Sequence, residues 1–225
     1  ACNYNPNANI DDGSCLYNDC AGECGGDGSS CDSTLIVPSE YSTIQSALNA
    51  ALDGDTVLVS VGTYVENITW PATNGIKLIG SGEDDCFIDG DSLASVIRFE
   101  EDLGGIIDAT TLITGFTIQN GNVLEGSNNE GGGMYLYQSN PTLTSVTFSG
   151  NTAVSGGGMY LYQSSPTLTG VTFSGNTAEY DGGGMDLLES SPTLTDVTFS
   201  NNSAGSGGGM YLRENSNSIL TGVTF

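Results

Sequence analysis

Potential metal ligands are concentrated at the N-terminus of the chain. Asparagine and aspartate alternate there with other residues at period two, and Gly13 follows. Oxygen ligands of this kind suit Ca²⁺. The phase differs from that of an EF-hand loop, because Gly13 at the invariant glycine would put Ala8 and Ile10 at ligand positions. We therefore expect either a Ca²⁺ site or an asparagine-rich turn segment. The candidate ligands are Asn3, Asn5, Asn7, Asp11 and Asp12.

Five of the six cysteines also lie in residues 1–33, which contain few apolar residues that could form a core. Disulfides or a metal must hold such a segment if it is ordered. Paired C-x-x-C spacings are absent, which favours disulfides over zinc. We expect a Cys2–Cys15 bridge and one bridge among the other three, while Cys86 either pairs with the remaining cysteine or stays buried and free. The candidate disulfide cysteines are Cys2, Cys15, Cys20, Cys24 and Cys31.

The chain offers little for acid–base catalysis. It contains no histidine, and its only basic side chains, Lys77, Arg98 and Arg213, are scattered. Hydrolysis of a glycoside needs only two carboxylates, and the aspartates between residues 84 and 91 could supply them. We interpret these as turn residues between strands, and we assign no catalytic residue. A polysaccharide lyase or hydrolase is the alternative.

The charge of the chain is strongly acidic, with 27 acidic residues and a net charge of −24. This charge repels phosphate backbones and anionic membranes, so we expect no nucleic-acid partner. It favours cations such as Ca²⁺, but we interpret it first as a solvated acidic surface, with specific cation sites as the alternative. No apolar run reaches the roughly 18–20 residues that a membrane helix needs, so we expect no membrane insertion.

A repeat occupies residues 131–225 and determines how the side chains of this region are positioned. The marker methionines Met134, Met159, Met185 and Met210 are 25, 26 and 25 residues apart. Apolar and polar residues alternate within each copy, which is the strand signal, and glycine triplets and Ser-Pro pairs supply corners. One copy cannot bury its own apolar face, so the copies must stack at roughly 4.8 Å per coil. The repeat therefore predicts an all-β fold, a parallel β-helix.

Stacking places equivalent residues in columns. We expect Asn151, Asn176 and Asn202 to form a structural ladder in which each amide bonds its neighbours. Outward tyrosines form two further columns, which could bind sugars or pack against another molecule. One holds Tyr135, Tyr160 and Tyr211, interrupted by Asp186; the other holds Tyr137 and Tyr162, continued by Leu188 and Arg213.

A third outward face carries threonines at matching positions of each copy. They form the columns Thr142, Thr167, Thr193 and Thr144, Thr169, Thr195. The Thr-x-Thr array resembles those of ice-binding solenoids, although threonine is also a good outward strand residue.

The chain divides into a Cys-rich segment (1–33) and a β-helix (34–225). Within the β-helix we expect a capping region (34–92), irregular coils with an extra loop (93–130) and the regular repeats (131–225). In the capping region, Ser42 and Gln45 fit a capping box, and Ile44, Leu48, Ala51 and Leu52 share one helical face.

Three stretches resemble known families. Residues 41–59 followed by Gly62-Thr-Tyr-Val-Glu66 look like the N-terminal cap of pectin-lyase-like right-handed β-helices, where a short helix plugs the first coil. Gly-Gly-Gly-Met and Phe-x-x-Asn, complete at residues 148–151, 173–176 and 199–202, are similar to repeats of chlamydial polymorphic outer-membrane proteins. The Cys-rich run 1–15 and residues 19–27 resemble modules of secreted proteins from marine bacteria.

Together these observations predict an extracellular or cell-surface bacterial solenoid that is a structural or adhesive element of a fibre, filament or stalk. Because a bare solenoid end exposes a strand edge, we expect head-to-tail self-association. A β-helix that binds or degrades carbohydrate, with glycans as partners, is the alternative, and ice binding by the threonine arrays is a further one. The abrupt start at Ala1 and the stop within a repeat at Phe225 suggest part of a longer protein.

Overall fold

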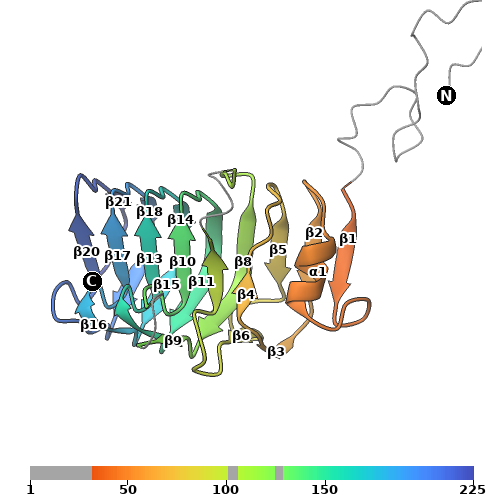
Figure 1. The fold of residues 1–225 in the computed structure, drawn as a ribbon, viewed down its shortest axis with the longest axis horizontal. Helices are drawn as coiled ribbons and strands as arrows, with labels where there is room; N and C mark the ends of the chain where they lie inside the picture. The colour runs from red at the N-terminus through yellow and green to blue at the C-terminus, as the bar shows by residue number, and fades with distance from the viewer. Residues whose placement is uncertain (1–31, 101–105, 125–128) are drawn as a thin grey trace, which may run out of the picture.

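The computed structural model describes residues 32–100, 106–124 and 129–225, and these form a parallel β-solenoid (Figure 1). The predicted all-β fold with one short helix is thereby confirmed. The coils succeed one another along the long axis, with β1 and β20 toward opposite ends. All strand pairs between coils are parallel, as expected where each coil returns to the same position one step further on.

A sheet of twelve strands runs the length of the solenoid. Its central path is β1 (Thr34–Val37), β2 (Thr56–Val59), β5 (Lys77–Gly80), β8 (Leu112–Gln119), β11 (Thr142–Ser149), β14 (Thr167–Thr169), β18 (Thr193–Thr195) and β21 (Ile219–Thr221). Four further strands of this sheet lie beside the path. Here β3 (Gly62–Val65) pairs with β6 (Cys86–Asp89), and β15 (Thr172–Ser174) pairs with β19 (Thr198–Ser200).

Two further sheets complete the wall. The second sheet consists of β4 (Ile68–Thr69), β7 (Ile97–Phe99), β10 (Met134–Tyr137), β13 (Met159–Tyr162), β17 (Met185–Leu188) and β20 (Met210–Arg213). The third consists of β9 (Asn122–Val123), β12 (Thr152–Ser155) and β16 (Thr177–Asp181). The coil that ends in β16 is one residue longer than its neighbour, and the pairing of β12 with β16 shifts by one residue between Ala153 and Ser155. A bulge thus absorbs the extra residue.

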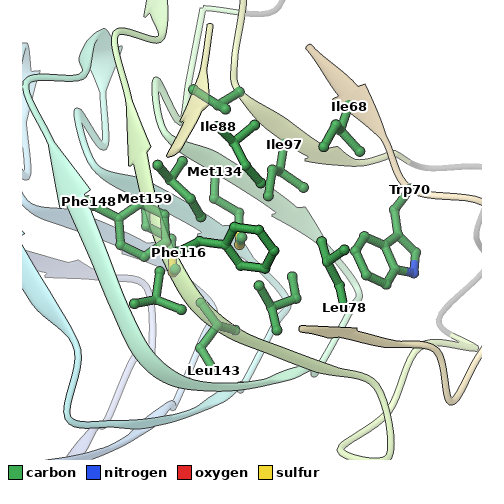
Figure 2. Close-up of a cluster of buried hydrophobic side chains, with 14 of the residues drawn as sticks. Ile68, Trp70, Leu78, Ile88, Ile97, Phe116, Met134, Leu143, Phe148 and Met159 are labelled. Atoms are coloured by element: carbon green, nitrogen blue, oxygen red, sulfur yellow. The ribbon is translucent and has the colours of Figure 1, made fainter. Parts of the chain in front are cut away.

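The interior consists of apolar side chains stacked coil upon coil. Figure 2 shows Leu78, Phe116, Met134 and Leu143 within the space that the strands enclose. The phenylalanines at the matching position of the last four coils stack with successive ring centroids 4.9 Å apart. This spacing agrees with the strand separation in a sheet, so the rings follow the backbone without offset. The stacked residues are Phe148, Phe173, Phe199 and Phe225.

Helix α1 (Ile44–Ala50) packs over the N-terminal end of the core, against β1, β2 and β4. The predicted N-cap was wrong by one residue: Thr43, not Ser42, caps the helix and forms a reciprocal box with Ser46. The predicted buried face was also wrong at its end, because Leu52 is 71% exposed. The helix buries Ile44, Ala47 and Leu48.

Candidate functional site

The outward face of the second sheet carries the column in which the repeat is least regular. The pairing register places Arg98 beside Tyr135, Tyr135 beside Tyr160, Tyr160 beside Asp186, and Asp186 beside Tyr211. The interrupted tyrosine column expected from the sequence therefore has the expected order. We call these five residues and Arg213 the arginine–tyrosine column.

Arg98 occupies the start of the column. Its guanidinium carbon lies 4.1 Å from the centroid of the Tyr135 ring, within the range of a cation–π contact. Its Nε donates to Glu100 Oε1 at 2.6 Å, and Nη1 donates to Ser95 Oγ at 3.1 Å. The arginine is thus held in place on both of its sides and is not free to bind an anion.

The two tyrosines at the centre of the column form a parallel stack. Their ring centroids are 5.7 Å apart and their planes differ by 1°. Burial raises the pKa of Tyr135 and of Tyr160 to about 12, although a nearby arginine opposes the shift in each case. Tyr160 is only 6% exposed, so it packs within the column instead of presenting a free face.

Asp186 and Arg213 close the column with a buried ion pair. Arg213 Nη2 donates to Asp186 Oδ2 at 2.9 Å and to the Tyr160 hydroxyl at 3.2 Å, and its guanidinium carbon lies 5.8 Å from the Tyr160 ring centroid. The Asp186 side chain is fully buried, whereas that of Arg213 is about one-third exposed. Asp186 Oδ1 and Arg213 Nε have no hydrogen-bond partner among the described residues. This contact links three successive coils.

The environment of Asp186 disfavours its charge. Desolvation by burial raises the pKa of the carboxyl to about 6, while Arg213 opposes the rise and Asp181 adds to it. An acid whose pKa is higher in the folded protein binds protons more tightly there than in the unfolded chain. The contribution of Asp186 to stability is therefore greatest below pH 4 and is lost as the pH rises through 6.

Replacing Asp186 with asparagine should remove this pH dependence. Each unit of pKa shift corresponds to about 1.4 kcal/mol, so we expect the stability difference between wild type and D186N to change by about 2 kcal/mol between pH 4 and pH 7, in favour of the wild type at pH 4. Urea unfolding at both pH values measures it. Asp181→Asn should weaken this pH dependence without removing it, because the Asp181 carboxylate adds to the rise in the pKa of Asp186. An unchanged difference between the two pH values would contradict the assignment.

A second outward column lies next to the first. Tyr137 and Tyr162 meet edge to face with ring centroids 5.2 Å apart, and Leu188 and Arg213 continue the column in register. Gln138 Nε2 donates to Gln163 Oε1 at 2.8 Å, and Gln163 in turn donates to Glu189. Tyr137 and Tyr162 are half-buried, so part of each ring faces solvent.

The asparagines 151, 176 and 202 lie directly above one another in the interior. The side-chain amides of Asn151 and Asn176 each donate to the oxygen of the next asparagine and to a backbone carbonyl of the preceding coil, all at 3.0 Å. The oxygen of Asn176 also accepts from the backbone N–H of Asn151. The ladder therefore satisfies buried backbone groups at a corner where no strand pairing is available.

Sequence reasoning missed a second polar ladder of the same kind. Ser139, Ser164 and Ser190 are fully buried. The backbone N–H of each donates at 3.0 Å to the Oγ of the matching serine in the next coil. Each of the three hydroxyls donates to the carbonyl two residues earlier in the chain. The repeating interval between these serines, which Ser216 continues, was the available signal.

The threonine columns are in register on the long sheet. Thr142 pairs with Thr167 and then Thr193, and the column of Thr144 runs beside it. Thr144 Oγ1 donates to Thr114 Oγ1 at 2.9 Å. Ice binding by this array remains a prediction from the sequence.

Of the acidic residues considered for hydrolysis, Asp89 has the most hydrogen bonds described for its carboxylate. Burial would raise the pKa of Asp89, but hydrogen bonds from the Asp91 backbone and from Gln119 and Asn120 outweigh it and lower the pKa. Asp89 is thus an acceptor that organises a turn. In the described ranges, no group of three or more His, Cys, Asp or Glu side chains is placed to hold a metal ion. Cys86 is a buried free thiol.

A hollow of about 290 Å³ lies at the corner where the sequence predicts an extra loop. Its lining combines two exposed leucines with two small polar side chains: Ser92, Leu93, Asn122 and Leu124. These residues offer no titratable group, so the hollow has no evident chemistry.

The predicted disulfide and calcium sites lie outside the described residues. They are Cys2, Cys15, Cys20, Cys24 and Cys31, and Asn3, Asn5, Asn7, Asp11 and Asp12.

Comparison with known proteins gives one match. A family model described as "Right handed beta helix region" matches residues 52–225. No curated protein and no solved structure matches the chain. Within the described part of the chain, no helix is both long and apolar enough to cross a membrane.

Proposed function

The chain belongs to the right-handed β-helix family, and on this basis we propose that it is a rigid structural element of a bacterial surface fibre or stalk, located outside the cell. The observation that carries the proposal is the in-register stacking of the phenylalanines of the last four coils, whose successive ring centroids are 4.9 Å apart. Buried asparagine and serine ladders run alongside this stack. Coils joined by apolar and hydrogen-bonded ladders resist bending and shear, as a stalk requires.

The two ends of the solenoid differ. At the N-terminal end, Gln45 of α1 covers the edge of β4: its Nε2 donates to the Thr69 carbonyl at 2.9 Å, and its Oε1 accepts from the Thr69 N–H at 2.8 Å. Glu66 accepts the N–H groups of Ile44 and Gln45 at the start of the helix. These contacts cover the edge of β4, whereas β1 and β3 at this end each pair with one strand among those described.

The last coil of this chain carries apolar side chains that are buried in every earlier coil. Phe225 stacks on Phe199 yet is 68% exposed, and Leu220, in register with the buried Leu194, is 46% exposed. Exposed strand edges with apolar inward residues pair readily with other strands. We propose that the edge of this coil pairs with a further coil, and that copies of the 225-residue chain associate through it where no further coil of the same protein follows.

The difference between the two ends bears on how copies would associate. Head-to-tail stacking, expected from the sequence, requires the last coil of one copy to dock on the α1 end of the next. Pairing of two last coils requires nothing of α1 and stops at a dimer. Filaments therefore support the head-to-tail arrangement, and discrete dimers support pairing between last coils.

Electron microscopy and sedimentation of the 225-residue chain test the proposal. Leu220→Lys places a charge at an inward position of the edge and should abolish association. Thr221→Lys adds the same charge at the neighbouring outward position, so it should leave association intact. Wild-type protein that stays monomeric at high concentration, or equal effects of both variants, would refute self-association through this coil.

Carbohydrate binding is the second candidate, and the half-exposed Tyr137–Tyr162 pair beside Gln138 and Gln163 favours it. Aromatic faces next to amides can hold a sugar ring. Glycan-array binding that is lost in Tyr162→Ala would support this function. Tyr160 is a poor probe, because its near-complete burial makes an alanine there a packing defect.

A further inference from the structure

The repeated coils are almost interchangeable where they contact one another. Methionine pairs with methionine, leucine with leucine and phenylalanine with phenylalanine from β10 to β20 and from β11 to β19. The asparagine and serine ladders repeat in the same way. These contacts favour stacking but do not specify which coil follows which. A chain that skips one coil would form the same ladders, because register is weakly specified among equivalent strands.

Asp186 and Arg213 depart from this uniformity at two positions where earlier copies carry tyrosine. Asp186 stands in register between Tyr160 and Tyr211, and Arg213 follows Tyr162 and Leu188 in the adjacent column. The two residues meet diagonally across the β17–β20 pair at 2.9 Å. We propose that the Asp186–Arg213 pair is a register key that forces β20 to stack on β17 and not on an earlier coil.

The geometry shows which misalignment the key excludes. If β20 stacked on β13 and the coil of β17 looped out, Met210 and Leu212 would find Met159 and Leu161 in place of Met185 and Leu187. The apolar ladders would be unchanged. Arg213 would lose its carboxylate partner, and the aspartate would leave the column with the looped coil. This misalignment therefore breaks the ion pair that the correct order forms.

The Asp186–Arg213 pair does not prevent every coil from being skipped. If β17 stacked on β10 and the coil of β13 looped out, Asp186 and Arg213 would stay together and Tyr135 would replace Tyr160 beside them. The proposal thus makes a position-specific claim: loss of the key should release the coil of β17, and it should leave the coil of β13 protected.

Burial explains why an ion pair serves this role. The Asp186 side chain is fully buried, and Oδ1 has no partner among the described residues. Such a pair adds little net stability but makes one arrangement distinct from its competitors, which is the best-attested use of a buried polar contact. The charged groups around Asp186 are Arg213 on β20 and Asp181 at the end of β16, and the Tyr160 hydroxyl on β13 bonds the same arginine.

Hydrogen-exchange mass spectrometry of refolded protein tests the key. D186Y/R213Y restores the tyrosines of the earlier copies and removes the key. After refolding from urea, we expect two isotope envelopes, one protected and one exchanged, in peptides from residues 182–202. Peptides from residues 156–176 should show a single protected envelope. Wild type should show one protected envelope in both regions.

Leu188→Tyr is the matched control, since it restores a tyrosine on the same strand but keeps the ion pair, and it should give one envelope. If D186Y/R213Y does not fold, D186N/R213Q, which nearly preserves side-chain shape, takes its place with the same expected two envelopes. A key-less variant that refolds with a single protected envelope throughout overturns the proposal. Two envelopes in residues 156–176 instead of 182–202 would also overturn it.

Discussion

Asn176→Leu should cost about 4 kcal/mol of unfolding free energy, although the side chain keeps nearly the same size. Asn176 is fully buried and makes hydrogen bonds of 3.0 Å in both directions along the solenoid. Leucine would remove the acceptor of both the Asn151 backbone N–H and the Asn151 side-chain amide, and one donor to the Phe148 carbonyl. Each buried unsatisfied backbone group costs about 1–3 kcal/mol. Urea unfolding followed by circular dichroism measures the loss.

Ser174→Ala is the control for this substitution. Ser174 lies in the same coil on the outer face, in register with Ser149 and Ser200. Surface changes of this kind usually fall within about 0.5 kcal/mol. If N176L and S174A cost the same, the asparagine ladder does not contribute to stability in the way its geometry indicates.

Gly157→Ala should cost about 3 kcal/mol of unfolding free energy or more. A Cβ at this position would lie 2.5 Å from the carbonyl oxygens of both Gly183 and Thr177, which belong to the backbone of the next coil. Neither oxygen belongs to a side chain that could rotate away, so the coils would have to separate locally. Overpacking typically costs about 1–3 kcal/mol, and more where only backbone can yield. Thermal and urea unfolding measure the effect.

Gly170→Ser separates this clash from a simple loss of glycine. Gly170 has a φ of +61° and open space where a Cβ would lie, and the matching position carries Ser145 in one coil and Asp196 in another with similar positive φ. The left-handed conformation costs a residue with a side chain about 1 kcal/mol. A loss for G157A no greater than that for G170S would show that the coils approach less closely than described.

Much of the fold was predictable because period and register carry so much information in a repeat. The alternation around the marker methionines predicted strands, and equal spacing predicted which residues stack. The capping helix shows where this reasoning stopped. Ser42 with Gln45 matches the Ser/Thr-x-x-Glu/Gln signature of a capping box, whereas Thr43 with Ser46, which forms the box, does not. Gln45 instead covers the edge of β4. That use depends on a strand more than twenty residues away.

The arginine–tyrosine column shows a similar limit. The order of its residues followed from spacing, but the burial of Tyr160 and Asp186 did not. Arg213 belongs by register to the neighbouring column and reaches diagonally to Asp186. The direction of a long side chain depends on the charges around it. Here the desolvated carboxylate of Asp186 determines the direction of the Arg213 side chain. The spacing of residues in the sequence indicates neither the burial of Tyr160 and Asp186 nor the direction of the Arg213 side chain.

The spacing of 4.9 Å between stacked phenylalanines has a consequence for how such genes diversify. Apart from the Arg213–Tyr160 contact, each coil in the regular region packs against the coil before it and the coil after it, through interior side chains that recur from copy to copy. Recombination between two misaligned copies of the gene therefore inserts or deletes a whole coil while reusing interfaces that already exist. The length of the rod can change in evolution by single steps, without any new contact having to be selected.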